Sequence, residues 1–147
     1  MRVLEQLEPQ GVFRFFEELC AIPHGSRNCQ AVSDWCVAFA KERGLEHCQD
    51  EAGNVILIQE ATPGYEAADP ILIQGHLDMV CEKEPGCTKD MEKEGLDLYV
   101  EDGFVRARGT TLGGDDGIAV AMALAILADR PLPHPRLEVV LTPEEAI

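Results

Sequence analysis

The chain has 147 residues, 46% of them hydrophobic, which is enough for one ordinary domain with a buried core. Its 27 acidic and 12 basic residues give a formal charge of −15, and this argues against nucleic acid as a partner because phosphate backbones are bound through clustered Lys and Arg. The longest apolar run, Ile118 to Ala128, is shorter than the roughly 20 residues of a membrane-spanning helix, so we expect no membrane partner.

The cysteines and the N-terminus indicate the cellular compartment. The six cysteines contain no C-x-x-C pair, and their spacings match no zinc-finger pattern. The N-terminal sequence "MRVLEQLEPQGVFRFFEEL" is too charged for a secretory signal peptide. We therefore expect a cytoplasmic protein whose thiols are reduced.

The first part of the chain predicts two helices and three strands. Apolar residues recur at helical spacing over 5–21 and over 29–44, where Gly44 supplies the stop. The β-prone segments that follow are 45–51, 54–60 and 70–79, and the first two suit a hairpin.

The second part predicts another hairpin, a buried helix and a last strand. Asp102-Gly103 favours a tight turn in the middle of a hairpin over 96–109. An apolar helix over about 116–128 and a strand over 136–142 follow. This order is typical of an α/β domain with a mixed sheet flanked by helices.

Two of the predicted strands contain nearly continuous apolar runs, "ILIQ" and "LEVVL", so we expect helices on both faces of them. In such sheets, ligands bind at the carboxyl ends of the central strands. Three polar pairs stand just past a strand or at the start of a helix: His76-x-Asp78, Asp115-Asp116 and Glu144-Glu145.

His76 and Asp78 are two residues apart, so their side chains point to the same side of an extended chain. A metal-bound imidazole usually donates its other ring N–H to a carboxylate or carbonyl group, and Asp78 has the right position for this. The alternative interpretation is a strand that simply ends in a polar loop.

The two acidic pairs also have structural interpretations. Asp115 or Asp116 suits the N-cap of the apolar helix, where a carboxylate accepts a free backbone N–H. Around Glu144, the sequence "TPEEAI" resembles a capping box that starts at Thr142 and places Glu145 three residues later. Both interpretations stay open for each pair taken alone.

Taken together, the three pairs favour a metal centre. One imidazole and several carboxylates at strand ends are the donors that suit zinc, manganese or cobalt in a hydrolytic site. A divalent cation would also relieve the repulsion among the carboxylates.

Three motifs, "GHLDMV", "GTTLGGDDGIAVAMALAILAD" and "LTPEEA", occur in this order, and the chain opens with "FFEELCAIPHGSRN". With these motifs the chain resembles the N-terminal part of the co-catalytic dinuclear zinc peptidases, and in particular the aminoacyl-histidine (Xaa-His, carnosine-cleaving) dipeptidases. The resemblance implies a zinc metallo-dipeptidase with two Zn²⁺ per full active site, for which Mn²⁺ or Co²⁺ are possible substitutes. It also implies a small peptide substrate and a homodimer for the full-length protein.

The resemblance implies a role for each matching residue. His76 would ligate the first metal, and Asp78 would orient His76. Asp115 would bridge the two metals. Glu144 would be the general base that deprotonates the attacking water, and Glu145 would ligate the second metal.

The resemblance further implies that residues 1–147 are only the N-terminal part of the catalytic domain. The lid or dimerisation domain and the C-terminal part, with one further ligand for each metal, would be absent. We therefore expect an incomplete site and no peptidase activity from this chain alone. The alternative is a non-catalytic α/β module that self-associates through an exposed sheet edge.

Overall fold

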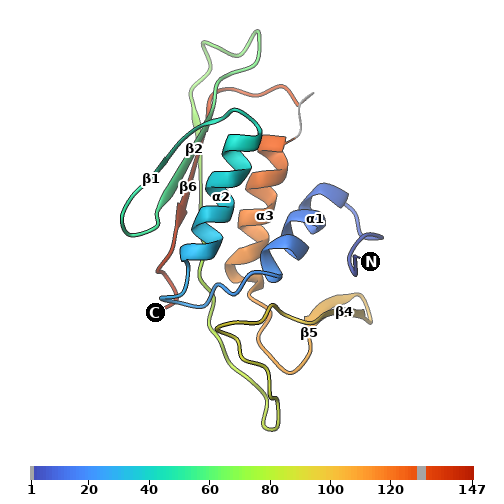
Figure 1. The fold of residues 1–147 in the computed structure, drawn as a ribbon. Coiled ribbons are helices and arrows are strands. Elements are labelled where there is room, and N and C mark those ends of the chain that lie inside the picture. The colour runs from blue at the N-terminus through green and yellow to red at the C-terminus, as the bar shows by residue number, and fades with distance from the viewer. Residues whose placement is uncertain (1, 129–131) are drawn as a thin grey trace.

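The computed structural model describes residues 2–128 and 132–147 of the chain (Figure 1). The helices are α1 (Gln10–Cys20), α2 (Gln30–Glu42) and α3 (Gly114–Ala128). The strands are β1 (Glu46–Gln49), β2 (Val55–Gln59), β3 (Ile71–His76), β4 (Leu98–Glu101), β5 (Phe104–Ala107) and β6 (Leu137–Thr142). All the predicted elements are present in the predicted order.

The main sheet has the strand order β1-β2-β6-β3, and β4 and β5 form a separate hairpin. Strand β2 is antiparallel to β1 and to β6, whereas β3 is parallel to β6. The predicted mixed sheet and both predicted hairpins are thus confirmed. Because β3 and β6 are parallel, with His76 opposite Thr142, the carboxyl ends of these two strands lie side by side.

The core lies on one face of this sheet. The side chains of Val55, Leu57, Val139 and Leu141 on that face are fully buried, and they alternate with more exposed residues along β2 and β6. Helices α2 and α3 cover this face, and α1 packs against α3 (Figure 1).

The other face of the sheet is open, so the expectation of helices on both faces is wrong for this chain. Ile56 is 38% exposed and Leu72 is 61% exposed. Strand β3 is an edge strand, and Ile71 at its start is also exposed. The described helices provide one covering layer, which leaves an apolar strand such as "ILIQ" half uncovered.

Helix α1 begins at Gln10, five residues later than predicted, because Pro9 occupies the N-cap position and proline is disfavoured in a helix interior. The preceding segment is held instead by a side chain. The Glu17 carboxylate accepts the backbone N–H groups of Val3 and Leu4, at 2.6 and 3.0 Å. Within 2–128 and 132–147, the structure has no helix with the length and apolar character needed to cross a bilayer.

Candidate active site

The candidate site lies where three segments end or begin. His76 is the last residue of β3, Asp115 lies at the start of α3, and Glu145 follows the end of β6. Gly75 lets α3 approach the strand closely, because a Cβ atom at this position would lie 3.2 Å from Asp116 Oδ2. The same Asp116 oxygen accepts the backbone N–H of His76 at 3.0 Å. This contact joins the start of α3 to the end of β3.

On one side of the imidazole, Nδ1 of His76 lies 3.0 Å from Asp78 Oδ1 and 2.9 Å from the Asp78 carbonyl oxygen. Both neighbours are acceptors, so Nδ1 carries a proton. Asp78 is fully buried. Its carboxylate also accepts the Ser26 hydroxyl at 2.7 Å and the backbone N–H groups of Glu145 and Ala146 at 3.0 and 2.8 Å.

These four donors decide the charge state of Asp78. Burial alone would raise the pKa of this carboxyl group, but the hydrogen bonds from the Glu145 N–H, Ser26, the Ala146 N–H and His76 outweigh it, and the pKa is lowered. Asp78 is therefore a buried carboxylate that ties together the end of β3, the loop at Ser26 and the segment after β6.

On the other side of the imidazole, Nε2 of His76 lies 3.0 Å from Asp115 Oδ1 and 3.4 Å from Glu145 Oε2. The Asp115 side chain is 94% exposed. Burial alone would lower the pKa of His76, but the hydrogen bonds to Asp115 and Asp78 raise it overall. Because two carboxylates face Nε2, this position favours a cation, either a proton or a metal ion.

The structure decides against capping as the role of both acidic pairs. Asp115 and Asp116 have non-helical backbone angles inside α3, and their side chains contact His76. In the described part of the chain, neither makes a hydrogen bond to a backbone N–H of α3. No helix starts at Thr142 among the described residues, so Glu145 is not part of a capping box.

Glu144 is the one predicted site residue without an ion pair or hydrogen bond to His76 among the described residues. Among the described residues, its side chain makes no ion pair or hydrogen bond with His76, Asp78 or Asp115. Its charge contributes instead to the environment of Cys29, whose pKa is raised to about 12, mainly by burial and then by Asp78. The structure thus brings together His76, Asp78, Asp115 and Glu145.

The spacing of Nε2 of His76 and the two carboxylate oxygens that face it is partly consistent with zinc ligation. Ligand atoms at about 2.0–2.1 Å from a tetrahedral zinc lie roughly 3.3 Å apart. Asp115 Oδ1, which is expected to share the first metal with His76, lies 3.0 Å from Nε2, and Glu145 Oε2, which is expected to ligate the second metal, lies 3.4 Å from it. However, the described residues contain no group of three or more His, Cys, Asp or Glu side chains arranged to hold a metal ion. The cluster therefore holds part of a ligand set.

Sequence reasoning missed the other groups that hold Asp78. Ser26 lies 52 residues before Asp78 in the chain, in a loop whose sequence carries no signal for this contact. The donation by the main chain at Glu145 and Ala146 is independent of side-chain type. His24, in the same loop, is buried, and Nδ1 of its ring contacts the Ile22 carbonyl oxygen at 2.8 Å; burial lowers its pKa.

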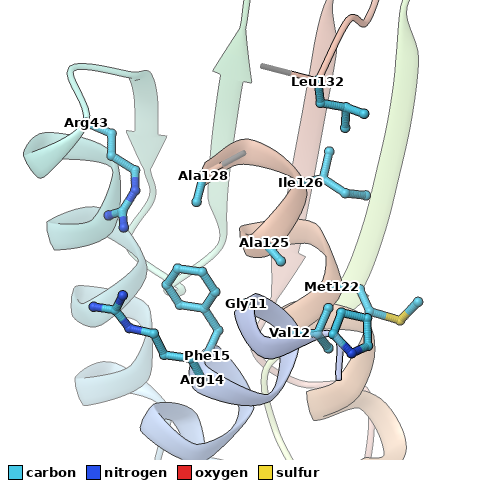
Figure 2. Close-up of a pocket in the computed structure, with 11 residues that line it drawn as sticks. Gly11, Val12, Arg14, Phe15, Arg43, Met122, Ala125, Ile126, Ala128 and Leu132 are labelled. Carbon is cyan, nitrogen blue, oxygen red and sulfur yellow. The ribbon is translucent and has the colours of Figure 1, made fainter. Parts of the chain in front are cut away.

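A separate apolar pocket of about 600 Å³ lies between α1, the C-terminal half of α3 and Arg43 (Figure 2). Its lining includes Val12, Phe15 and Ile126 and none of the predicted site residues. Ile126 lies eleven residues beyond Asp115, which corresponds to about 16 Å along a helix. This pocket is therefore not part of the candidate site.

Comparison with known proteins relates the whole chain to dipeptidases. No family model matches. The chain is 41% identical over 145 residues to the cytosol non-specific dipeptidase of Escherichia coli strain K12, covering 99% of this chain and 30% of that protein. It superimposes with a TM-score of 0.94, at 37% identity, on the aminoacylhistidine dipeptidase of Vibrio alginolyticus, covering 97% of this chain and 29% of that one.

A tripeptidase from Staphylococcus aureus shares the fold, with a TM-score of 0.73 at 23% identity, over 92% of this chain and 36% of its own. The chain thus spans about a third of the length of these relatives, or less. The predicted resemblance to the N-terminal part of aminoacyl-histidine dipeptidases is confirmed, and so is the peptidase-like α/β fold as a partial unit.

Proposed function

We propose that this chain, which has the sequence and fold of the N-terminal part of a dipeptidase, forms one portion of a dinuclear zinc site. The corresponding full-length protein would be a cytoplasmic, homodimeric enzyme that hydrolyses dipeptides of the Xaa-His type. The observation that carries the proposal is the His76 imidazole, whose Nδ1 is held by Asp78 while its Nε2 faces Asp115 and Glu145. The similarity to dipeptidases over 99% of the chain supports the reaction class.

Four residues have proposed roles in metal binding. His76 and Asp115 would hold the first metal, and Asp115 and Glu145 the second. Asp78 fixes the tautomer and the orientation of His76, which keeps the Nε2 lone pair directed outward. When bound, the metals supply Lewis-acid polarisation of the scissile carbonyl and lower the pKa of water.

The proton transfers fall to a glutamate. Glu144 would accept the proton of the attacking water and pass it to the leaving amine. Among the described residues its carboxylate makes no ion pair with His76, so the imidazole does not occupy its oxygens. The backbone N–H groups of Glu145 and Ala146 both donate to Asp78, and they hold the Glu145 carboxylate 3.4 Å from Nε2 of His76.

The 147-residue chain alone would not turn over peptide. By this assignment each metal keeps two protein ligands, where a catalytic zinc normally has three. A hydrolysis assay with His-containing dipeptides and added zinc tests this directly. Turnover that disappears in the Glu144→Ala variant would contradict it.

Zinc calorimetry on the chain with its cysteines kept reduced tests the proposed site itself. We expect binding that weakens by at least about tenfold in His76→Ala and in Asp115→Ala, because each removes one of few ligands. Glu101→Ala, at the exposed end of β4, is the matched control and should bind like the parent chain. Equal affinity in all four proteins would rule out His76 and Asp115 as ligands.

A second candidate function rests on the sheet edge. Strand β3 is an edge strand whose Ile71 and Leu72 are 48% and 61% exposed, and its sequence ILIQGH contains no Asp, Glu, Lys or Arg. Such an edge favours pairing with another strand. A molar mass by light scattering that rises with concentration, unaffected by zinc and abolished by Leu72→Lys, would favour a self-associating module; a constant monomer mass would exclude it.

A further inference from the structure

A second pocket, of about 460 Å³, lies behind the residues that hold Asp78. Its walls include Ser26, Arg27, Cys81, Glu92 and Ala146. Neither His76 nor Asp115 lines it, so it is separate from the proposed metal site. It nevertheless adjoins that site through Ser26 and Ala146.

The walls of this pocket are fixed by backbone contacts and by one side-chain hydrogen bond. Gly25 forms a parallel bridge with Met79, and the Ser26 N–H donates to the Met79 carbonyl oxygen at 3.2 Å. Across the pocket, the Asn28 side-chain amide donates to the Glu92 carbonyl oxygen at 3.2 Å. The loop at 25–28 is therefore attached both to the segment that follows β3 and to the opposite wall of the pocket.

Arg27 differs from every other described arginine. Within 2–128 and 132–147, it alone among the arginines has neither an ion pair nor an aromatic ring beneath its guanidinium group. The others pair with acidic residues or stack on Phe39, Phe104 or Tyr99. Arg27 also has a positive φ of 68°, a backbone conformation that is uncommon for non-glycine residues and frequent at functional sites.

Glu92 supplies the opposite charge. Its carboxylate has no ion pair or hydrogen bond with any described residue, and it does not pair with Arg27. The pKa of Cys81 in the same wall is raised by burial, by Glu82 and by Glu92, which places the Glu92 charge near the pocket. In a chain with 27 acidic and 12 basic residues, a free cation and a free anion facing one small pocket suit a ligand that carries both charges.

We propose that this pocket binds a free amino acid or dipeptide with unblocked termini, with Arg27 taking the α-carboxylate and Glu92 the α-ammonium group. A guanidinium fork matches a carboxylate in two parallel hydrogen bonds. The pocket volume lies in the range of small-ligand sites. Met91 and Cys81 in the lining offer an apolar surface for a side chain.

The occupant lies next to the proposed metal site without being part of it. Ser26 and Ala146 in the pocket wall donate to Asp78 Oδ2, while His76 contacts Oδ1. The ligand would thus rest against two of the groups that hold Asp78. The proposal needs neither metal nor hydrolysis, so it stands or falls independently of the proposed dipeptidase function.

Titration of the metal-free chain with L-alanyl-L-alanine, followed by ¹H–¹⁵N NMR in the presence of EDTA, tests this site. We expect saturable shifts of the amides of Gly25, Ser26, Asn28 and Ala146. Arg27→Gln and Glu92→Gln should each weaken binding by at least about tenfold, because each removes a charge-assisted hydrogen bond. Arg106→Gln, in the separate β4–β5 hairpin, is the control and should bind normally.

Blocked peptides assign each end of the ligand. L-alanyl-L-alanine amide lacks the carboxylate, so it should bind the parent chain weakly, and Arg27→Gln should reduce its affinity little further. N-acetyl-L-alanyl-L-alanine lacks the ammonium group, so it should also bind weakly, and Glu92→Gln should reduce its affinity little further. Both variants alter exposed side chains, and their NMR dispersion shows whether they fold. Shifts elsewhere, absence of shifts, or equal affinity for free and blocked peptides would overturn the proposal.

Discussion

On its Nδ1 side, His76 faces a carboxylate that is fully buried and already accepts three other donors; on its Nε2 side, it faces two carboxylates in solvent. Asp78 on the first side has an exposed fraction of 0%, and the Asp115 side chain on the second has one of 94%. The His76 imidazole thus lies between a buried carboxylate whose hydrogen bonds are satisfied and two exposed carboxylates that can still bind a cation.

This difference separates the hydrogen bonds of Asp78, which stabilise the fold, from the carboxylates of Asp115 and Glu145, which are available to bind a ligand. Buried polar groups are costly to leave unpaired, so the Asp78 network contributes to folding whether or not metal is present. The Asp115 and Glu145 carboxylates gain little from facing His76 in water. Their arrangement matters chiefly when a cation binds between them.

The largest expected effect comes from removing the buried carboxylate. Asp78→Ala leaves Ser26, His76 and the two backbone N–H groups after β6 without their acceptor, and we expect the free energy of unfolding to fall by about 3 kcal/mol. Urea denaturation followed by circular dichroism measures this loss. A change below about 1 kcal/mol would show that the network is dispensable and would remove the contrast between the two sides.

The reactivity of the Cys29 thiol provides a second measurement of the stability that Asp78 contributes. Cys29 is buried, its pKa is raised to about 12 mainly by burial and then by Asp78, and thiols react as thiolates. In the native chain we expect a disulfide reagent to label exposed Cys48 rapidly and Cys29 very slowly. In Asp78→Ala, Cys29 should be labelled about 100-fold faster, in proportion to the lost stability.

Peptide mapping by mass spectrometry separates the two cysteines in that experiment, and Cys48 provides the internal control because its exposure does not depend on Asp78. Equal labelling rates for Cys29 and Cys48 in the parent chain would mean that the region around Asp78 opens freely.

A smaller effect is expected from Ser26→Ala. The hydroxyl donates one hydrogen bond, of 2.7 Å, to Asp78 Oδ2, and its removal leaves the Ala146 N–H on the same oxygen. We expect a loss of about 1 kcal/mol in urea denaturation. Ser26→Thr retains a hydroxyl group and should recover part of the loss; no difference between the two variants would exclude this hydrogen bond as a source of stability.

The smallest effect on stability is expected from changing Asp115, the exposed carboxylate that faces Nε2 of His76. Asp115→Asn changes an exposed carboxylate, so the free energy of unfolding should change by less than about 0.5 kcal/mol. Zinc affinity, in contrast, should fall markedly in the same variant. A large loss of stability in Asp115→Asn would show that this side, too, is part of the folded framework.

Much of the fold could be predicted from the sequence, because hydrophobic periodicity and turn residues are local signals. The two hairpins, the apolar helix and the mixed sheet follow from such signals. The start of α1 was misplaced because the helical spacing continues past Pro9. The open face of β3 was missed because an apolar run indicates that a strand can be buried, not that a second layer is present.

The candidate site divides in the same way. The sequence by itself determined the donor types and their spacing: His76 and Asp78 on one side of a strand, and acidic pairs at the starts of two other segments. Only the tertiary structure decided that Glu145 rather than Glu144 reaches His76, and that Ser26 and two backbone N–H groups hold Asp78. These contacts join residues more than 50 positions apart, and main-chain donors carry no sequence signal. The parallel pairing of β3 and β6 brings Glu145 and Ala146 to Asp78, and the bridge between Gly25 and Met79 brings Ser26 there.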